Sequence, residues 1–150
     1  MIYYFLKEDF DELNRKIYKF VEKLKNISLE IGRDCHEDRG IFTFEEGERQ
    51  KQILSARLRE LIQIKNNAKI VMTGVKTDKI SVGKRVTLKD EVTGRIQTYN
   101  IGSYMILAKK ENTISYNTPI ARLLIGAQVD EVRSGEIAGK KRNFRILKIE

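Results

Sequence analysis

The chain is poor in the residues that build cross-links, metal centres and kinks. Its 150 residues include one cysteine (Cys35), one histidine (His36), one proline (Pro119) and no tryptophan. A single cysteine excludes an internal disulfide and favours a reducing cytoplasm as the compartment. One cysteine and one histidine are too few ligands for a zinc site. The lone proline marks the sharpest corner that the sequence predicts.

Long apolar runs and phosphate-binding loops are missing as well. No stretch approaches the ~18 consecutive apolar residues of a membrane span, and the apolar start, residues 1–6, is too short for a signal peptide. Neither Val82-Gly83-Lys84 nor Val75-Lys76-Thr77 has the glycine spacing of a phosphate loop. His36 has no nucleophile or orienting carboxylate beside it. We therefore expect no membrane partner, no tightly bound cofactor and no enzymatic activity of the chain's own.

Positive charge is concentrated in the second half. Residues 1–74 carry 14 Lys/Arg and 13 Asp/Glu, a net charge of +1, whereas residues 75–150 carry 15 and 8, a net charge of +7. A basic second half indicates an acidic partner surface or nearby nucleic acid, although a solvated surface with this excess is also common.

The first half has the apolar period of two helices. One series has helical spacing along residues 10–31: Phe10, Leu13, Ile17, Phe20, Val21, Leu24, Ile27 and Ile31. A second runs along residues 44–68: Phe44, Ile53, Leu54, Leu58, Leu61, Ile62, Ile64 and Ala68. A polar segment between Gly32 and Gly40 predicts the turn. Residues 1–74 are therefore predicted to be an antiparallel coiled-coil hairpin, each arm roughly 40 Å long.

The second half alternates apolar and polar residues, as strands do. The alternating sets are Val82, Val86 and Leu88, then Ile96, Tyr99 and Ile101, then Tyr104, Ile106 and Ala108. Glycine-containing turns are predicted at Thr93–Gly94 and at Gly139–Lys140. Residues 75–150 are thus predicted to be a small α+β domain with four to five antiparallel strands and one short helix.

That helix begins in the stretch from Ile114 to Gly126. Asn117 or Thr118 can cap it, because a short side-chain oxygen accepts a hydrogen bond from a free backbone N–H. Pro119 suits the first helical position, where its missing N–H costs nothing. Gly126 can end the helix in a left-handed conformation.

The same stretch, ISYNTPIARLLIG, resembles the C-terminal domain of the bacterial Gre transcript-cleavage factors, GreA and GreB. The resemblance continues in residues 81–89, 98–103, 130–132 and 144–149, in the family's order. It implies an FKBP-like C-terminal domain after the coiled-coil hairpin, and a cytoplasmic monomer that binds bacterial RNA polymerase.

In that family the hairpin tip enters the polymerase secondary channel, where its acids help to hold a catalytic Mg²⁺ and stimulate cleavage of backtracked RNA. The resemblance implies this role for Glu37 and Asp38, with Asp34 beside them, and only in complex with the polymerase. The Mg²⁺ would be shared with the polymerase active site, so the chain is expected to be an accessory factor.

Two further sets of site residues follow from the resemblance. Polymerase docking is expected at Asn117, Thr118, Pro119, Ile120 and Arg122, with the alternative that Ile120 belongs to the core. Indirect contact with the nascent RNA 3′ end is expected at Arg49, Lys51 and Arg57 on the arm, where solvated lysines and arginines are the common alternative.

Two other functions stay open. Counting back from Arg57-Leu58 places the family's two tip acids at Glu37 and Gly40, so one acid position holds glycine. This departure favours a secondary-channel regulator or inhibitor that does not stimulate cleavage. The third hypothesis is a coiled-coil adaptor for a partner other than polymerase.

Overall fold

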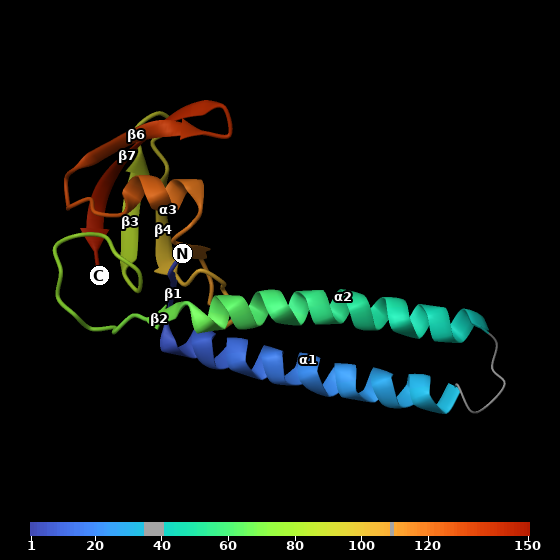
Figure 1. The fold of residues 1–150 in the computed structure, drawn as a ribbon. Coiled ribbons are helices and arrows are strands. Elements are labelled where there is room, and N and C mark those ends of the chain that lie inside the picture. The colour runs from blue at the N-terminus through green and yellow to red at the C-terminus, as the bar shows by residue number, and fades with distance from the viewer. Residues whose placement is uncertain (35–40, 109) are drawn as a thin grey trace. The chain divides into compact units, whose positions relative to one another are not determined.

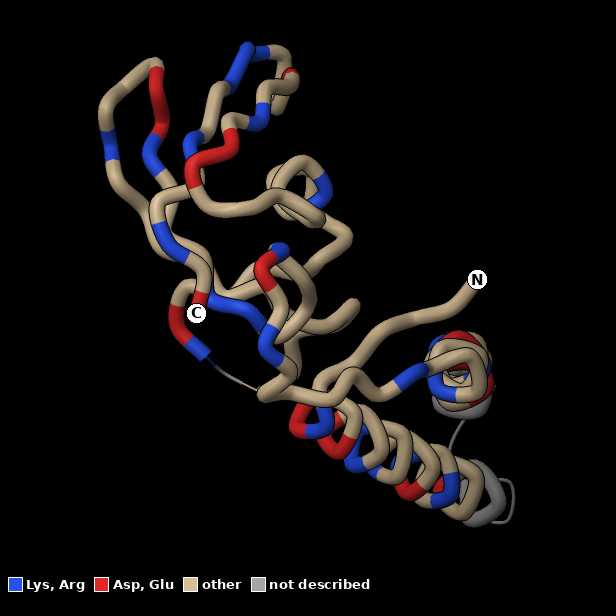
Figure 2. Tube along the Cα trace, turned by 90° about the vertical axis from the view of Figure 1, so that its left-hand side faces the viewer, with Lys and Arg blue, Asp and Glu red and all other residues tan. Residues whose placement is uncertain are grey.

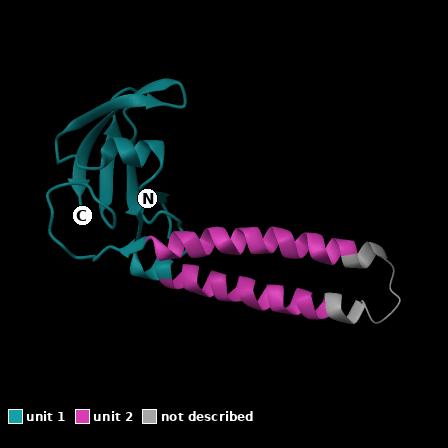
Figure 3. Cartoon of the chain, viewed as in Figure 1, with its two compact units in different colours: residues 1–10, 68–150 teal, residues 11–67 magenta. Residues whose placement is uncertain are grey.

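The fold is known from a computed structural model, which describes residues 1–34, 41–108 and 110–150, without the side chains of 31–44. The chain divides into two compact units, one formed by Asp11–Asn67 and the other by Met1–Phe10 together with Ala68–Glu150 (Figure 3). This division differs from the predicted boundary between residues 74 and 75, because the N-terminal ten residues group with the second half of the chain.

The first unit is a helical hairpin. Helix α1 (Lys7–Asp34) and helix α2 (Ile41–Asn66) run antiparallel, side by side (Figure 1). With 28 residues in α1, that arm is about 42 Å long. Leu13 and Ile27 of α1 are buried, as are Leu61 and Ile64 of α2. The hairpin predicted from the apolar spacing is therefore confirmed.

The buried stripe of each arm is narrower than the sequence pattern suggests. Val21 is 42% exposed, Ile53 61% and Ile62 37%, although all three were assigned to the apolar stripes. Consecutive helical residues point about 100° apart, so Val21 turns away from the seam that its neighbour Phe20 faces. A two-helix hairpin offers no third element to cover these side chains.

The second unit is built on a five-stranded sheet in the order β5-β4-β3-β7-β6. Its strands are β3 (Arg85–Asp90), β4 (Ile96–Gly102), β5 (Thr113–Ser115), β6 (Val132–Ile137) and β7 (Lys140–Ile149). The α+β class is confirmed. The sheet is mixed rather than wholly antiparallel, because β5 pairs with β4 in parallel. Parallel neighbours need a crossover connection, which residues 103–112 provide.

That connection contains a wrong prediction. Tyr104, Ile106 and Ala108 were expected to form a strand, but they lie in the crossover between β4 and β5. Their backbone bonds outside the sheet: the Tyr104 N–H donates to the Tyr4 carbonyl (2.9 Å) and the Ala108 N–H to the Asp9 carboxylate (2.8 Å). Alternation alone cannot distinguish a strand from a loop with these partners.

The short helix α3 (Pro119–Leu124) covers one face of the sheet (Figure 1). Ala121 and Leu124 of α3 pack with Val86 and Leu88 of β3 and with Ile146 of β7, all fully buried. The helix therefore seals the central strands and leaves the ends of the sheet to the two hairpin turns.

Those turns hold close to their predicted positions. Gly94, in the β3–β4 turn, has φ +73°, as a tight turn at Thr93–Gly94 requires. The β6–β7 turn is centred on Ala138 (φ +53°) and Gly139 (φ +76°), one residue earlier than predicted. Positive φ at both central residues is the two-residue turn that matches strand twist.

The chain start forms an additional small sheet. Strand β1 (Tyr3–Phe5) pairs in parallel with β2 (Ala68–Ile70). Tyr3 also packs on Tyr104, with ring centroids 4.5 Å apart. These pairings explain why the start of the chain belongs to the second unit. Neither strand was predicted, since three residues are too few to show a period.

Candidate functional site

The corner before α3 is built as its sequence predicts. Thr118 is the N-cap: its Oγ1 accepts from the Ala121 N–H (3.4 Å) and donates to the Ser115 carbonyl (2.8 Å). Pro119 follows in the first helical turn, and Gly126, with φ +86°, lies just beyond the C-cap. The hydroxyl thus ties the helix start to β5, so the exposed ring of Pro119 is held on a rigid support.

Asn117 and Arg122 form a clasp across this corner. The Arg122 Nε donates to the Asn117 Oδ1 at 3.1 Å, and a second guanidinium nitrogen of Arg122 donates to the same oxygen. Arg122 and Pro119 are exposed, whereas Ile120 is half-buried and packs against the core. The structure therefore brings the five predicted docking residues together, with Ile120 partly a core residue.

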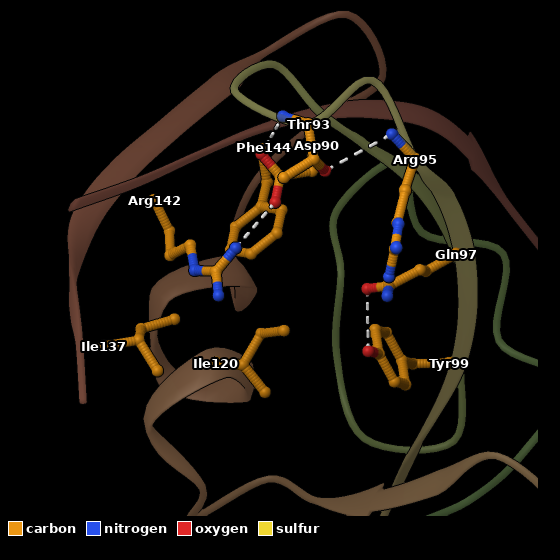
Figure 4. Close-up of a pocket in the computed structure, with 9 residues that line it drawn as sticks. All are labelled: Asp90, Thr93, Arg95, Gln97, Tyr99, Ile120, Ile137, Arg142 and Phe144. Carbon is orange, nitrogen blue, oxygen red and sulfur yellow. Dashed lines mark hydrogen bonds and ion pairs between the residues drawn. The ribbon is translucent and has the colours of Figure 1, made fainter. Parts of the chain in front are cut away.

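A pocket of about 260 Å³ opens beside this corner on the second unit (Figure 4). Its apolar wall consists of Ile120 from α3, Ile137 from β6 and Phe144 from β7. The remaining lining residues are polar or aromatic: Asp90, Thr93, Arg95, Gln97, Tyr99 and Arg142. Figure 4 shows Arg142 on the side of Ile137, and Arg95, Gln97 and Tyr99 on the opposite side.

Asp90 organises the closed end of the pocket. It is 5% exposed, and its Oδ1 accepts from the N–H groups of Val92 (2.9 Å) and Thr93 (3.3 Å). Its Oδ2 accepts from Arg142 at 3.1 Å. The Val92 N–H is the largest cause that holds the pKa of Asp90 below its ordinary value, with the Arg142 guanidinium contributing. Asp90 is therefore an ionised, fully engaged acceptor at neutral pH.

The opposite side of the pocket holds uncommitted charge. The Tyr99 hydroxyl donates to the Gln97 Oε1 at 2.8 Å, which orients both side chains. The guanidinium of Arg95, on an exposed residue, has no hydrogen-bond or ion-pair partner among the residues that the structure describes. The pocket thus combines an apolar wall with one arginine free to meet an anion.

The predicted tip acids are largely beyond the described residues. Asp34 is the last residue of α1, but its side chain is not described, and Glu37 and Asp38 lie outside the described residues altogether. Elsewhere in the described chain, no three His, Cys, Asp or Glu side chains are grouped so that they could hold a metal ion.

The predicted basic residues of the arm do not form one patch. Arg49 and Lys51 are two residues apart on α2, so their side chains point to nearly opposite sides of the helix. Arg57 is paired with Glu60 at 2.6 Å. Figure 2 shows acidic and basic residues interleaved along both arms. A contact with one RNA strand could use Arg49 and Arg57 together, but not Lys51 as well.

The pocket residues other than Ile120 were missed by sequence reasoning. Arg95 follows a turn glycine, and Ile137 and Arg142 flank another turn, positions that ordinarily mean only a hairpin. They share a pocket because β4, β3, β7 and β6 are neighbours in the sheet, and no local pattern reveals that order.

No described helix has an apolar stretch long enough to span a bilayer.

Comparison with known proteins gives a consistent result. Residues 75–150 match the family model described as "Transcription elongation factor, GreA/GreB, C-term". A relative named "Transcription elongation factor GreA" from Mesomycoplasma hyopneumoniae is 36% identical over 103 residues, which cover 67% of this chain and 63% of the relative. One of the same name from Thermosipho melanesiensis is 30% identical over 128 residues, covering 85% of this chain and 78% of the relative.

The first of these alignments spans less than two thirds of the relative's length. A solved structure described as "Structure of the transcription factor Gfh1" aligns with 99% of this chain at 22% identity and a TM-score of 0.47. Likeness at that level carries no information on function.

Proposed function

Because this chain belongs to the GreA/GreB family of transcription elongation factors, we propose that it binds bacterial RNA polymerase and modulates elongation through the secondary channel. The observation that carries the proposal is the family match over residues 75–150, the part of the chain that contains the corner before α3. The confirmed helical hairpin supports it, because a long, thin arm suits delivery of a tip into a channel.

Docking is assigned to the corner. Pro119 and Arg122 are exposed, and the Thr118 cap and the Asn117–Arg122 clasp hold them in place before any partner arrives. A pre-ordered corner loses little conformational entropy on binding. Ile120 contributes its half-buried side chain to the same surface.

Cleavage stimulation is assigned to the tip. Asp34, Glu37 and Asp38 supply hard carboxylate oxygens, which is the donor type that Mg²⁺ prefers. A Mg²⁺ held jointly with the polymerase supplies an activated water when bound. The chain's own part is to present one or two carboxylates and, through the arm, to position them.

The second candidate is a secondary-channel regulator that does not stimulate cleavage. It is favoured by Gly40, which stands where the resemblance places a tip acid. With fewer ligands at the tip, the arm would occupy the channel without completing the metal site.

A transcript-cleavage assay separates these candidates. Backtracked elongation complexes are mixed with the wild-type protein, with a Glu37→Ala/Asp38→Ala variant, and with Glu22→Ala/Glu30→Ala as a control of equal charge change on the arm. If wild type and control shorten the RNA and the tip variant does not, the tip is the source of stimulation. If none cleaves but all slow elongation, the regulator is supported. If none binds or affects polymerase, the proposed function is wrong and a non-polymerase adaptor remains.

A further inference from the structure

The pocket beside α3 has the size and charge of a receptor for one side chain of a protein partner. We propose that it binds an apolar side chain flanked by a carboxylate, from an acidic segment of the polymerase surface. This rests on the proposed function for the identity of the partner. The carboxylate would pair with Arg95, and the apolar side chain would contact Ile120, Ile137 and Phe144.

The size argues for a peptide side chain. The cavity is about 260 Å³, below the roughly 300–1,000 Å³ of sites that enclose small molecules and cofactors. A space of this size accommodates one large aliphatic or aromatic side chain, while the rest of the ligand stays outside. Proteins anchor in one another through single buried side chains of this kind.

The charges set the sign of the ligand. Asp90 already accepts from two backbone amides and from Arg142, so it has little capacity to attract an incoming cation. Arg95 has no partner within the described residues and presents a planar fork suited to a carboxylate. The net charge of +7 over residues 75–150 attracts an acidic surface in the same direction.

The apolar wall separates a protein ligand from a nucleic acid. Phosphate contacts require cations and little apolar surface. Ile120, Ile137 and Phe144 would remain uncovered if a phosphate alone sat on Arg95. A side chain that fills the cavity and a carboxylate that meets Arg95 satisfy both halves of the pocket.

The pocket is also held ready for binding. Asp90 lies at the end of β3, Arg142 reaches it from the neighbouring β7, and Ile137 comes from β6, which pairs with β7. The walls are therefore fixed by strand register rather than by mobile loops, which lowers the entropic cost of association.

The first test is equilibrium binding of the full chain to bacterial core RNA polymerase. Arg95→Glu is expected to weaken binding by roughly tenfold or more, because a like charge then faces the carboxylate. Lys76→Glu is the matched control: it makes the same charge change on an exposed linker residue outside the pocket, and is expected to bind within about twofold of wild type. If the two variants weaken binding equally, the pocket proposal is overturned and the proposed function stands.

The second test does not need polymerase. The ¹⁵N-labelled full chain is titrated with the synthetic peptide Ac-Glu-Leu-Glu-Leu-Glu-NH₂, with its lysine analogue, and with a single-stranded RNA oligonucleotide. Shifts of the Arg95, Ile137 and Arg142 amides by the acidic peptide alone, lost in Arg95→Glu, support the proposal. No shift with millimolar acidic peptide, or shifts with RNA instead, overturn it. If wild type fails to bind polymerase while the peptide still enters the pocket, the proposed function fails and the pocket chemistry survives.

Discussion

Removing the Asp9 carboxylate is expected to destabilise the second unit strongly. Asp9 is 4% exposed, and it accepts from the Ser103 hydroxyl (2.5 Å) and from the N–H groups of Leu107 (2.9 Å) and Ala108 (2.8 Å). The Ser103 hydroxyl in turn accepts from the Leu6 N–H at 2.8 Å. One carboxylate therefore orders the crossover after β4 against the first turn of α1.

The magnitude follows from the donors left behind. In Asp9→Ala three donors lose their acceptor, and each buried, unsatisfied donor costs roughly 1–3 kcal/mol. Because Leu107 and Ala108 are only partly buried, water can replace some of these bonds, so we expect a total loss of about 3–4 kcal/mol. Asp9→Asn keeps one oxygen for the two amides and should cost about 1–2 kcal/mol, the difference made by losing a charged acceptor.

The assay is urea unfolding followed by far-UV circular dichroism, with the free energy of unfolding extrapolated to water. Asp78→Ala, at an exposed linker position, is the control and should stay within about 0.5 kcal/mol of wild type. Ser103→Ala combined with Asp9→Ala should cost less than the sum of the two single changes, because both belong to one network. An Asp9→Ala variant as stable as the control would refute the reasoning.

Three further predictions concern the second unit. The folded-state pKa of Asp90 is lowered, so its stabilisation is present above the unfolded pKa near 3.8 and is lost as the pH falls through the lower folded value; Asp90→Asn should therefore lose less stability between pH 7 and pH 3 than wild type, measured by urea unfolding at each pH. Thr118→Ala should destabilise by about 1 kcal/mol through loss of the α3 cap, with a serine replacement close to wild type in the same assay. Gly102→Ala should cost about 1–3 kcal/mol in thermal unfolding, because its Cβ would lie 2.5 Å from Ile106 and 2.6 Å from Thr113, whereas Gly94→Ala, with open space at its Cβ, would cost only the strain of its positive φ.

The predictable part of the fold depends on signals that are local in the chain. The 3–4-residue spacing around Leu13 and Leu61 predicted both arms, since one helical turn brings such residues to one face. Thr118, Pro119 and Gly126 predicted both ends of α3, because capping depends on residues within one turn. The predicted docking residues lie together for the same reason: they are consecutive.

The failed predictions concern partners distant in sequence. The alternation at Tyr104 and Ala108 was real but described a crossover, whose backbone bonds to Tyr4 and Asp9 about a hundred residues away. Strand β1 was missed because its partner, β2, lies beyond both arms. Nothing near Arg95 in the sequence reveals that it shares a pocket with Arg142.

By itself the sequence determined the two helical arms, the capped corner at Pro119, the basic second half and the family. These depend on periodicity, on capping and on residue identity, all readable within a few neighbours. Only the tertiary structure decided that β5 joins the sheet in parallel, that Asp9 is buried among crossover amides, and that Arg95 faces an apolar pocket. Each of these is a pairing between distant segments, and the order of strands in a sheet is set by the packing of the whole core rather than by any local pattern.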